Sequence, residues 1–170
     1  MNFVLCGMMG SGKTRLGKRI AELSFRNWLD TDDVIVEKYG KISEIFEKFG
    51  ETYFREKETE TVKILCRLDG YVFSTGGGLV LKDENVRLLK TSGKILYLRA
   101  KKETLLSRLS GDTKRPLLQG RESLEEKIDR LLKERAPVYE RVADVVLDVD
   151  GKSVEENAKR ALELLQGVEK

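Results

Sequence analysis

The sequence predicts one α/β domain with three layers, in which a five-stranded parallel sheet carries helices on both faces. Five short apolar segments alternate with longer segments whose apolar residues recur at helical spacing, the rhythm of a parallel sheet with crossover helices. The chain has 170 residues, of which 40% are hydrophobic and 36% charged, so one core can form beneath a charged surface. We find no internal repeat, low-complexity segment or linker, and therefore expect residues 1–170 to form a single domain.

The expected strands are short apolar runs. Strands of a parallel sheet are covered on both faces, so they are continuously apolar rather than alternating. We expect strands at residues 3–6, 27–29, 71–74, 94–98 and 143–148. The first is followed by a glycine loop, the second delivers Asp30, and the third runs into three consecutive glycines.

The expected helices are bounded by capping residues and glycines. Helical spacing predicts them at residues 13–23, 31–40, 43–49, 51–68, 83–90, 103–109, 123–135 and 153–165. Ser123 and Ser153 each precede a glutamate by three residues, which forms a capping box, and Asp83 is expected to cap its own helix. Residues 110–122 contain GDTKRPLLQG, a polar segment broken by glycine and proline, so we expect an exposed mobile loop there.

The composition excludes several classes of function. Histidine is absent, so Ser-His-Asp catalysis and histidine-ligated metals are excluded, and a general base must be a carboxylate or a lysine. The net charge of +3 is too small to indicate a nucleic-acid partner. Cys6 and Cys66 form no paired framework, which favours reduced thiols in a cytoplasmic protein. Neither a signal peptide nor a membrane span is expected, so we expect no membrane partner.

Residues 7–14 read GMMGSGKT and meet the phosphate-loop pattern G-x-x-x-x-G-K-[ST]. The glycines allow backbone N–H groups to wrap around phosphates, and the following helix adds its positive N-terminal end. Lys13 is expected to reach the β- and γ-phosphates, and the Thr14 hydroxyl to ligate Mg²⁺. The alternative is a chance glycine-rich turn, which a strand before the loop and a helix after it make improbable. The segment therefore predicts phosphoryl transfer from a magnesium-bound nucleotide.

Residues 30–32 read DTD and follow the second expected strand. The carboxyl ends of parallel strands converge on the ligand crevice, so both acids are expected near the phosphate loop. Asp30 and Asp32 could divide the work there, one acting on the metal and the other accepting a hydrogen bond from a substrate hydroxyl. The alternative is that these acids, with Asp33, cap the next helix. Their position favours the functional interpretation, and one of the acids can also act as a cap.

Residues 75–78 read TGGG and follow the third expected strand. Gly76, Gly77 and Gly78 place no side chain at the crevice, so a ligand can approach the backbone closely. A flexible turn is the alternative. Because this run lies beside a phosphate loop, we interpret it as the floor of a binding site.

Four arginines are candidates for binding anions. A kinase needs cations against the transferring phosphate, and a carboxylated acceptor needs a guanidinium fork. Arg55, Arg108, Arg115 and Arg135 could supply them, although an isolated arginine is more often a solvated surface group. Arg115 is the strongest candidate of the four, because arginines on mobile loops recurrently close over phosphates and exclude water.

Taken in order, these segments resemble those of the shikimate kinases over nearly the whole chain. The matching segments are GMMGSGKT at 7–14, DTD at 30–32, FREKE at 54–58, STGGG at 74–78, RPLL at 115–118 and RAPVY at 135–139. The resemblance implies a P-loop fold like that of the nucleoside monophosphate kinases, with a lid at 110–122 and a substrate-binding helical region at 31–62. It implies transfer of the γ-phosphoryl group of ATP to the 3-hydroxyl of shikimate, within chorismate and aromatic amino acid biosynthesis.

The resemblance also assigns the nucleotide side of the site. ATP-binding residues implied by it are Gly10, Ser11, Gly12, Lys13, Thr14, Arg15, Arg108, Arg115 and Lys152. Mg²⁺ is the implied cofactor, held by Thr14 and, through water, by Asp30. The strand before STGGG ends without the aspartate that many nucleotide hydrolases place there, and in this family Asp30 takes over that metal role.

On the acceptor side, the resemblance implies that Arg55 and Arg135 bind the shikimate carboxylate and that Asp32 binds its hydroxyls. The implied backbone contacts come from Gly76, Gly77 and Gly78, and the implied catalytic residues are Lys13, Asp32 and Arg115. The expected protein is a monomer whose partners are only small molecules. Two alternatives stay open, namely a gluconate or nucleotide kinase with this fold and a nucleotide-binding module without turnover.

Overall fold

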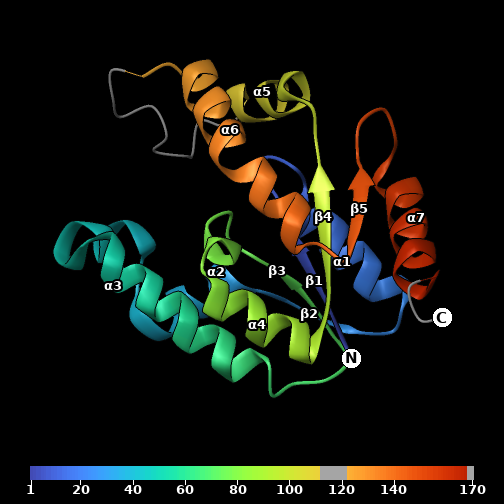
Figure 1. Cartoon of the computed structure of the whole chain (residues 1–170), viewed down its shortest axis with the longest axis horizontal. Helices are drawn as coiled ribbons and strands as arrows, with labels where there is room; N and C mark the ends of the chain where they lie inside the picture. Colours follow the sequence, from blue (N-terminus) through green and yellow to red (C-terminus); the bar gives the residue numbers. More distant parts are fainter. Residues whose placement is uncertain (112–121, 168–170) are drawn as a thin grey trace.

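The computed structural model describes residues 1–111 and 122–167, and its centre is a five-stranded parallel sheet (Figure 1). The strands are β1 (Asn2–Cys6), β2 (Asn27–Asp30), β3 (Tyr71–Ser74), β4 (Gly93–Arg99) and β5 (Val145–Asp148). Their order in the sheet is β2-β3-β1-β4-β5, and every neighbouring pair is parallel. From β1 the chain builds β2 and β3 on one side of β1 and then β4 and β5 on its other side. Open α/β sheets bind ligands at such a reversal of strand order, beside the carboxyl ends of the strands.

Helices cover both faces of the sheet, as the sequence predicts. They are α1 (Lys13–Leu23), α2 (Thr31–Tyr39), α3 (Ile42–Leu65), α4 (Asp83–Ser92), α5 (Lys102–Ser110), α6 (Leu124–Val142) and α7 (Val154–Gly167), with a 3₁₀ turn at Leu79–Leu81. Helices α1 and α7 pack against each other on one face, while α4 and α6 lie across the other (Figure 1). The predicted three-layer α/β class is therefore confirmed.

Helix α6 is longer than predicted. It was expected to end near Arg135, but it continues past Pro137 to Val142. Proline removes one N–H from the helical ladder and crowds the carbonyl four residues earlier, but the segment beyond it buries Tyr139 and Val142 against the core. Packing of this apolar face outweighs the local preference of proline. The capping box that Ser123 forms with Glu126 is present, as predicted.

Two other local predictions need correction. Asp83 is the first residue of α4 rather than its cap, which is Lys82, and no side-chain capping bond is found there within the described residues. The helices expected at 43–49 and 51–68 form one element, α3, which ends at Leu65 and is interrupted at Gly50. Gly50 has φ 82° and ψ 176°, a backbone conformation that glycine alone adopts at low cost.

The apolar interior is divided into two clusters. The larger lies between the sheet and the helices on its two faces. The smaller is formed by Ile35, Ile45 and Phe54, which join α2 to the first half of α3. In Figure 1 this pair of helices lies beside the sheet and extends beyond its edge. The segment that follows the DTD sequence thus holds together around apolar contacts of its own.

Both cysteines lie in the described part of the chain as free thiols. Cys6 is completely buried in β1, and burial raises its pKa to about 12. Cys66 is half-buried after α3. Over residues 1–111 and 122–167, none of the helices has the length and apolarity needed to cross a membrane.

Candidate active site

The GMMGSGKT segment forms a loop between β1 and α1. Gly7, Gly10 and Gly12 all have positive φ values, of 144°, 80° and 94°. These conformations are strained for residues with a side chain, which explains the glycines of the motif. The ammonium of Lys13 lies within the loop and donates to the carbonyls of Gly7 at 2.8 Å and Met8 at 2.9 Å.

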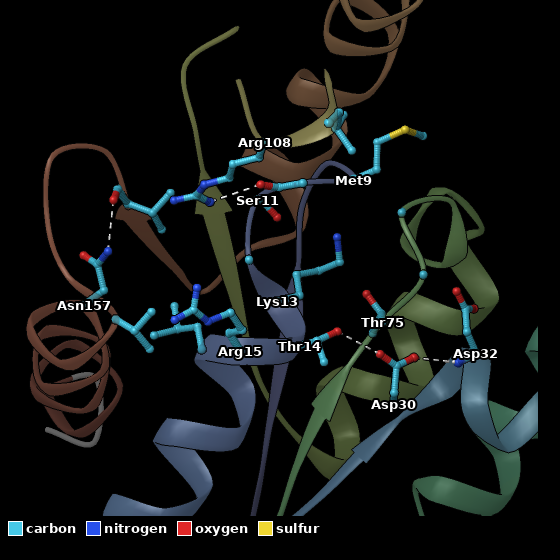
Figure 2. A pocket seen from close by; sticks show the side chains of 18 of the residues that line it. Met9, Ser11, Lys13, Thr14, Arg15, Asp30, Asp32, Thr75, Arg108 and Asn157 are labelled. Atoms are coloured by element: carbon cyan, nitrogen blue, oxygen red, sulfur yellow. Dashed lines mark hydrogen bonds between the residues drawn. The ribbon is translucent and has the colours of Figure 1, made fainter. Parts of the chain in front are cut away.

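A cavity of about 710 Å³ opens beside this loop at the carboxyl ends of the strands (Figure 2). It is lined by Gly10, Ser11, Gly12, Lys13, Thr14, Arg15, Asp30, Asp32, Gly76, Gly77, Arg108 and Lys152 among the predicted residues. The structure thus brings together residues from five separate places in the sequence. Arg115 lies outside the described residues, as does most of the segment predicted to be a lid.

Asp30 joins the first turn of α1 to the start of α2. Its Oδ1 accepts from the N–H of Asp32 at 2.9 Å and so caps α2, while its Oδ2 accepts from the Thr14 hydroxyl at 3.2 Å (Figure 2). The capping alternative is therefore confirmed for Asp30, and the same carboxylate also contacts Thr14, the other residue predicted to hold the metal. Burial raises the pKa of Asp30 above its usual value, and the N–H of Asp32 opposes that rise.

The carboxylate of Asp32 is buried beside the glycine run. Its Oδ1 has no hydrogen-bond partner among the described residues, although it is screened from solvent. Burial raises the pKa of Asp32 to about 6, and the charge of Asp30 adds to the rise, while Lys13 opposes it. A buried oxygen of this kind can accept a hydrogen bond from a ligand hydroxyl, and near neutral pH the group can also accept a proton.

Each glycine of the run at residues 76–78 lies against one of the side chains predicted to bind the acceptor. A Cβ at Gly76 would lie 2.8 Å from Asp32 Oδ1, and one at Gly77 would lie 3.1 Å from a terminal nitrogen of Arg135. A Cβ at Gly78 would lie 2.5 Å from both terminal nitrogens of Arg55. Only glycine therefore permits the three charged groups to approach this stretch of backbone. Gly78, Arg55 and Arg135 are not among the residues that line the cavity.

Arg55 is held by two carboxylates that the sequence analysis left without a role. Glu58, which is 1% exposed, accepts from Arg55 at 2.7 Å, and Glu51 accepts at 3.2 Å. Burial raises the pKa of Glu58, and the Arg55 guanidinium opposes that rise. The spacing of three residues within FREKE places both side chains on one side of a helix, and this spacing could have predicted the pair.

Tyr139 is a second residue missed from sequence. Its hydroxyl donates to the Gly77 carbonyl at 2.6 Å, and the positive charge of Arg135, four residues earlier in α6, opposes the rise of its pKa. The ring is fully buried and packs against Tyr97, with 5.1 Å between ring centroids. Burial raises the pKa of Tyr139 to about 12, so the hydroxyl stays protonated and able to donate.

On the nucleotide side, Arg108 donates to the Gly10 carbonyl at 3.0 Å, which ties α5 to the phosphate loop (Figure 2). Arg15 and Lys152 are exposed at the rim of the cavity. The structure adds Val149, Val154 and Asn157 to the lining, none of which carries a recognisable sequence signal. Val149 and Val154 add apolar surface to this part of the lining, and Asn157 adds a polar amide.

A phosphate loop on a parallel sheet, a lysine within the loop, and paired acids at the next strand end define the P-loop phosphotransferases as the class of this protein. Comparison with known proteins specifies the family. The family model for shikimate kinase matches residues 9–166, and the chain belongs to the shikimate kinase family.

Individual relatives agree with this result. The shikimate kinase of Thermodesulfovibrio yellowstonii is 45% identical over 162 residues, which cover 95% of this chain and 92% of the relative. The solved shikimate kinase of Acinetobacter baumannii, in complex with shikimate, is 38% identical with a TM-score of 0.91, covering 99% of this chain and 94% of that one. The Aquifex aeolicus shikimate kinase is 33% identical with a TM-score of 0.81, over 98% and 97% of the two chains.

Proposed function

We propose that this protein transfers the γ-phosphoryl group of ATP to the 3-hydroxyl of shikimate, giving shikimate 3-phosphate and ADP on the route to chorismate and aromatic amino acids. The observation that carries the proposal is the glycine run, against which Asp32, Arg135 and Arg55 all lie, next to the phosphate loop. One buried acid for hydroxyls and two guanidinium groups for a carboxylate suit a small carboxylated polyol. Membership of the shikimate kinase family supports the same acceptor.

In the proposed mechanism, the phosphate loop and Lys13 bind the β- and γ-phosphates. Arg55 and Arg135 hold the acceptor carboxylate and orient the ring. Asp32 receives a hydrogen bond from the reacting hydroxyl and takes its proton as the new P–O bond forms and the bond to ADP breaks. Arg108 and Arg115 add positive charge on the nucleotide side. Most of the catalysis is thus positioning and charge stabilisation, and a chain without histidine can perform it.

The residues of the site fit a magnesium ion. Mg²⁺ prefers oxygen ligands and keeps several waters when it is bound with a nucleotide. The Thr14 hydroxyl and the Asp30 carboxylate, 3.2 Å apart, provide two such oxygens beside the phosphate loop. When bound, the ion would neutralise charge on the phosphates, and Thr14 and Asp30 are the residues we propose to hold it.

The test is an acceptor screen with coupled detection of ADP. Purified protein should release ADP from MgATP when shikimate is added, and far less with gluconate or a nucleoside monophosphate. A preference for either of those acceptors would favour the second candidate, a different small-molecule kinase. ATP binding without turnover on any acceptor would favour a nucleotide-binding module.

Three finer expectations accompany the proposal. We propose that residues 31–62 bind the acceptor and that residues 110–122 act as a lid within one kinase domain. We also propose that the protein works as a monomer in the cytoplasm with small molecules as its only partners. Light scattering of the purified protein would test the monomer.

A further inference from the structure

A hydrogen-bonded relay connects strand β2 to the first turn of α1. The Trp28 indole Nε1 donates to the Ser74 hydroxyl at 3.0 Å, and this hydroxyl donates to the main-chain carbonyl of Lys13 at 2.9 Å. An indole N–H can only donate and a carbonyl can only accept, so the direction of both bonds is fixed. The relay starts at the single tryptophan of the chain and ends at the residue whose ammonium lies in the phosphate loop.

Close approach of α1 to the sheet makes the relay possible. Gly17, one turn beyond Lys13, is buried, and a Cβ there would lie 2.5 Å from Ser74 Oγ and 2.8 Å from Trp28 Nε1. A larger residue would therefore force these groups apart. The ammonium of Lys18 lies 4.6 Å from the centre of the indole ring, so the helix and the indole also attract each other directly.

The first turn of α1 needs such an external support. A helix that binds phosphates with its N-terminus keeps its first N–H groups for the ligand rather than for a capping side chain. Among the described residues, no side chain caps α1, whose N-cap is Gly12 in a left-handed conformation. The first turn is instead held from the side, by Ser74 on the Lys13 carbonyl and by Asp30 on the Thr14 hydroxyl.

Both supports involve strand β2. Trp28 and Asp30 are two residues apart in β2, so their side chains leave the same face of the strand. Ser74 is the residue paired with Asp30 in the neighbouring strand β3. One small area of the sheet thus fixes two consecutive residues of the helix, and Trp28 restrains Ser74 so that its hydroxyl proton faces Lys13.

We propose that Trp28, acting through Ser74, is a positioning residue for nucleotide binding. The relay holds the first turn of α1 in the orientation in which Lys13, Thr14 and the N–H groups of the turn meet the phosphates. The proposal rests on the proposed function only in taking ATP as the nucleotide. It predicts that the relay affects the binding of MgATP and leaves the acceptor side unchanged.

The test measures MgATP binding by calorimetry, without shikimate, in Trp28→Phe, Ser74→Ala and the double variant. We expect the dissociation constant to rise about 5- to 10-fold in each single variant, the effect of one lost hydrogen bond. The double variant should show about the same rise as either single variant, because all three break one relay. The shikimate KM should change by less than about twofold, since independent sites do not couple. Tyr71→Phe, which removes an aromatic hydroxyl from β3 away from the relay, is the matched control and should bind MgATP normally.

Unchanged MgATP affinity in Ser74→Ala, or single effects that multiply in the double variant, would overturn the proposal. Where Trp28→Phe does not fold, Ser74→Ala is combined with hydrogen exchange of the single indole N–H. That proton should exchange slowly in the original protein and faster in Ser74→Ala, and equal rates would refute the relay. Because binding is measured without an acceptor, the two proposals can fail separately. If the variants bind MgATP as expected but the protein does not phosphorylate shikimate, only the proposed function is contradicted.

Discussion

At the scale of single residues, the proposed role of Asp32 as a proton acceptor comes with a cost in stability. Its carboxylate is buried with one unpartnered oxygen among the described residues, and its pKa is raised to about 6. A folded-state pKa above the ordinary value means that the folded protein binds this proton more tightly than the unfolded chain does. Ionised Asp32 therefore destabilises the fold, fully above about pH 6 and not at all below the ordinary pKa of 3.8.

Asp32→Asn should therefore separate stability from activity. In metal-free protein at pH 8, we expect it to raise the free energy of unfolding by about 2 kcal/mol, because the buried charge is gone. The gain should shrink between pH 6 and pH 4 as Asp32 of the original protein takes up its proton. Phosphoryl transfer should fall by about 10²- to 10⁴-fold, the usual contribution of a general base. Urea unfolding across pH and ADP release measure the two effects, and a variant that is less stable at pH 8 would contradict the argument.

Arg135 should matter for acceptor affinity rather than for chemistry. Because the proposed carboxylate contact does not change during phosphoryl transfer, Arg135→Ala should remove binding energy equally from the ground state and the transition state. We expect the shikimate KM to rise about 10- to 100-fold, the value of a charge-assisted hydrogen bond, with kcat little changed. Steady-state kinetics measure both constants.

The control is Arg141→Ala, on the same helix. Arg141 is exposed, and among the described residues its ion pair is a long one with Asp83, at 3.8 Å. The kinetic constants of this variant should match those of the original protein. An unchanged shikimate KM in Arg135→Ala would remove Arg135 from the acceptor site.

At the scale of elements, the ends of helices show where local sequence and structure agree or disagree. Two capping boxes were predicted from sequence, and the Ser123 and Ser153 bonds are present. The continuation of α6 through Pro137 was not predicted, because it depends on the burial of Tyr139 in a core formed by distant segments. Phe25, after α1, is the one described residue other than glycine with a positive φ, at 54°.

Phe25→Gly should stabilise the protein. Phe25 is 99% exposed, so the aromatic ring offers little packing in return for its left-handed backbone, which glycine adopts freely. We expect the free energy of unfolding to rise by about 1 kcal/mol, measured by urea denaturation. Phe25→Ala removes the same ring without relieving the backbone and should give no gain. If both variants have the same stability, the strain argument fails.

At the scale of the whole molecule, the two apolar clusters divide the protein into parts of unequal stability. The larger cluster joins the sheet to helices on both faces, while Ile35, Ile45 and Phe54 form a separate small one. Regions with few buried apolar contacts open more readily than the main core. The proposed acceptor region is therefore expected to open on its own.

Ile45→Ala should loosen the acceptor region alone. Hydrogen exchange of amides in residues 31–54 should accelerate, while amides of the central strands keep their protection. Shikimate binding should weaken, and MgATP affinity should stay unchanged. Ile95→Ala, an equal truncation within the main cluster, is the control and should accelerate exchange throughout. Equal patterns in the two variants would show that the clusters unfold together.

The sequence predicted the fold class and the residues around the phosphate loop, because these features are local. GMMGSGKT, DTD and TGGG each follow a strand, and parallel strands bring their carboxyl ends together. The contact of Tyr139 with the Gly77 carbonyl was not predicted, since it depends on which face of α6 packs beside the glycine run. Val154 and Asn157 line the cavity only because α7 packs against α1.

The separate cluster of Ile35, Ile45 and Phe54 has an evolutionary consequence. Substitutions that reshape α2 and the first half of α3 can be compensated within this cluster and the partly buried residues packed against it, without repacking the sheet that supports the phosphate loop. Acceptor preference can therefore diverge while the machinery for handling ATP is inherited unchanged. For protein engineering, α2 and the first half of α3 form a segment that can be exchanged. Grafting a different helical pair between β2 and β3 is a direct way to seek kinases for new alcohols.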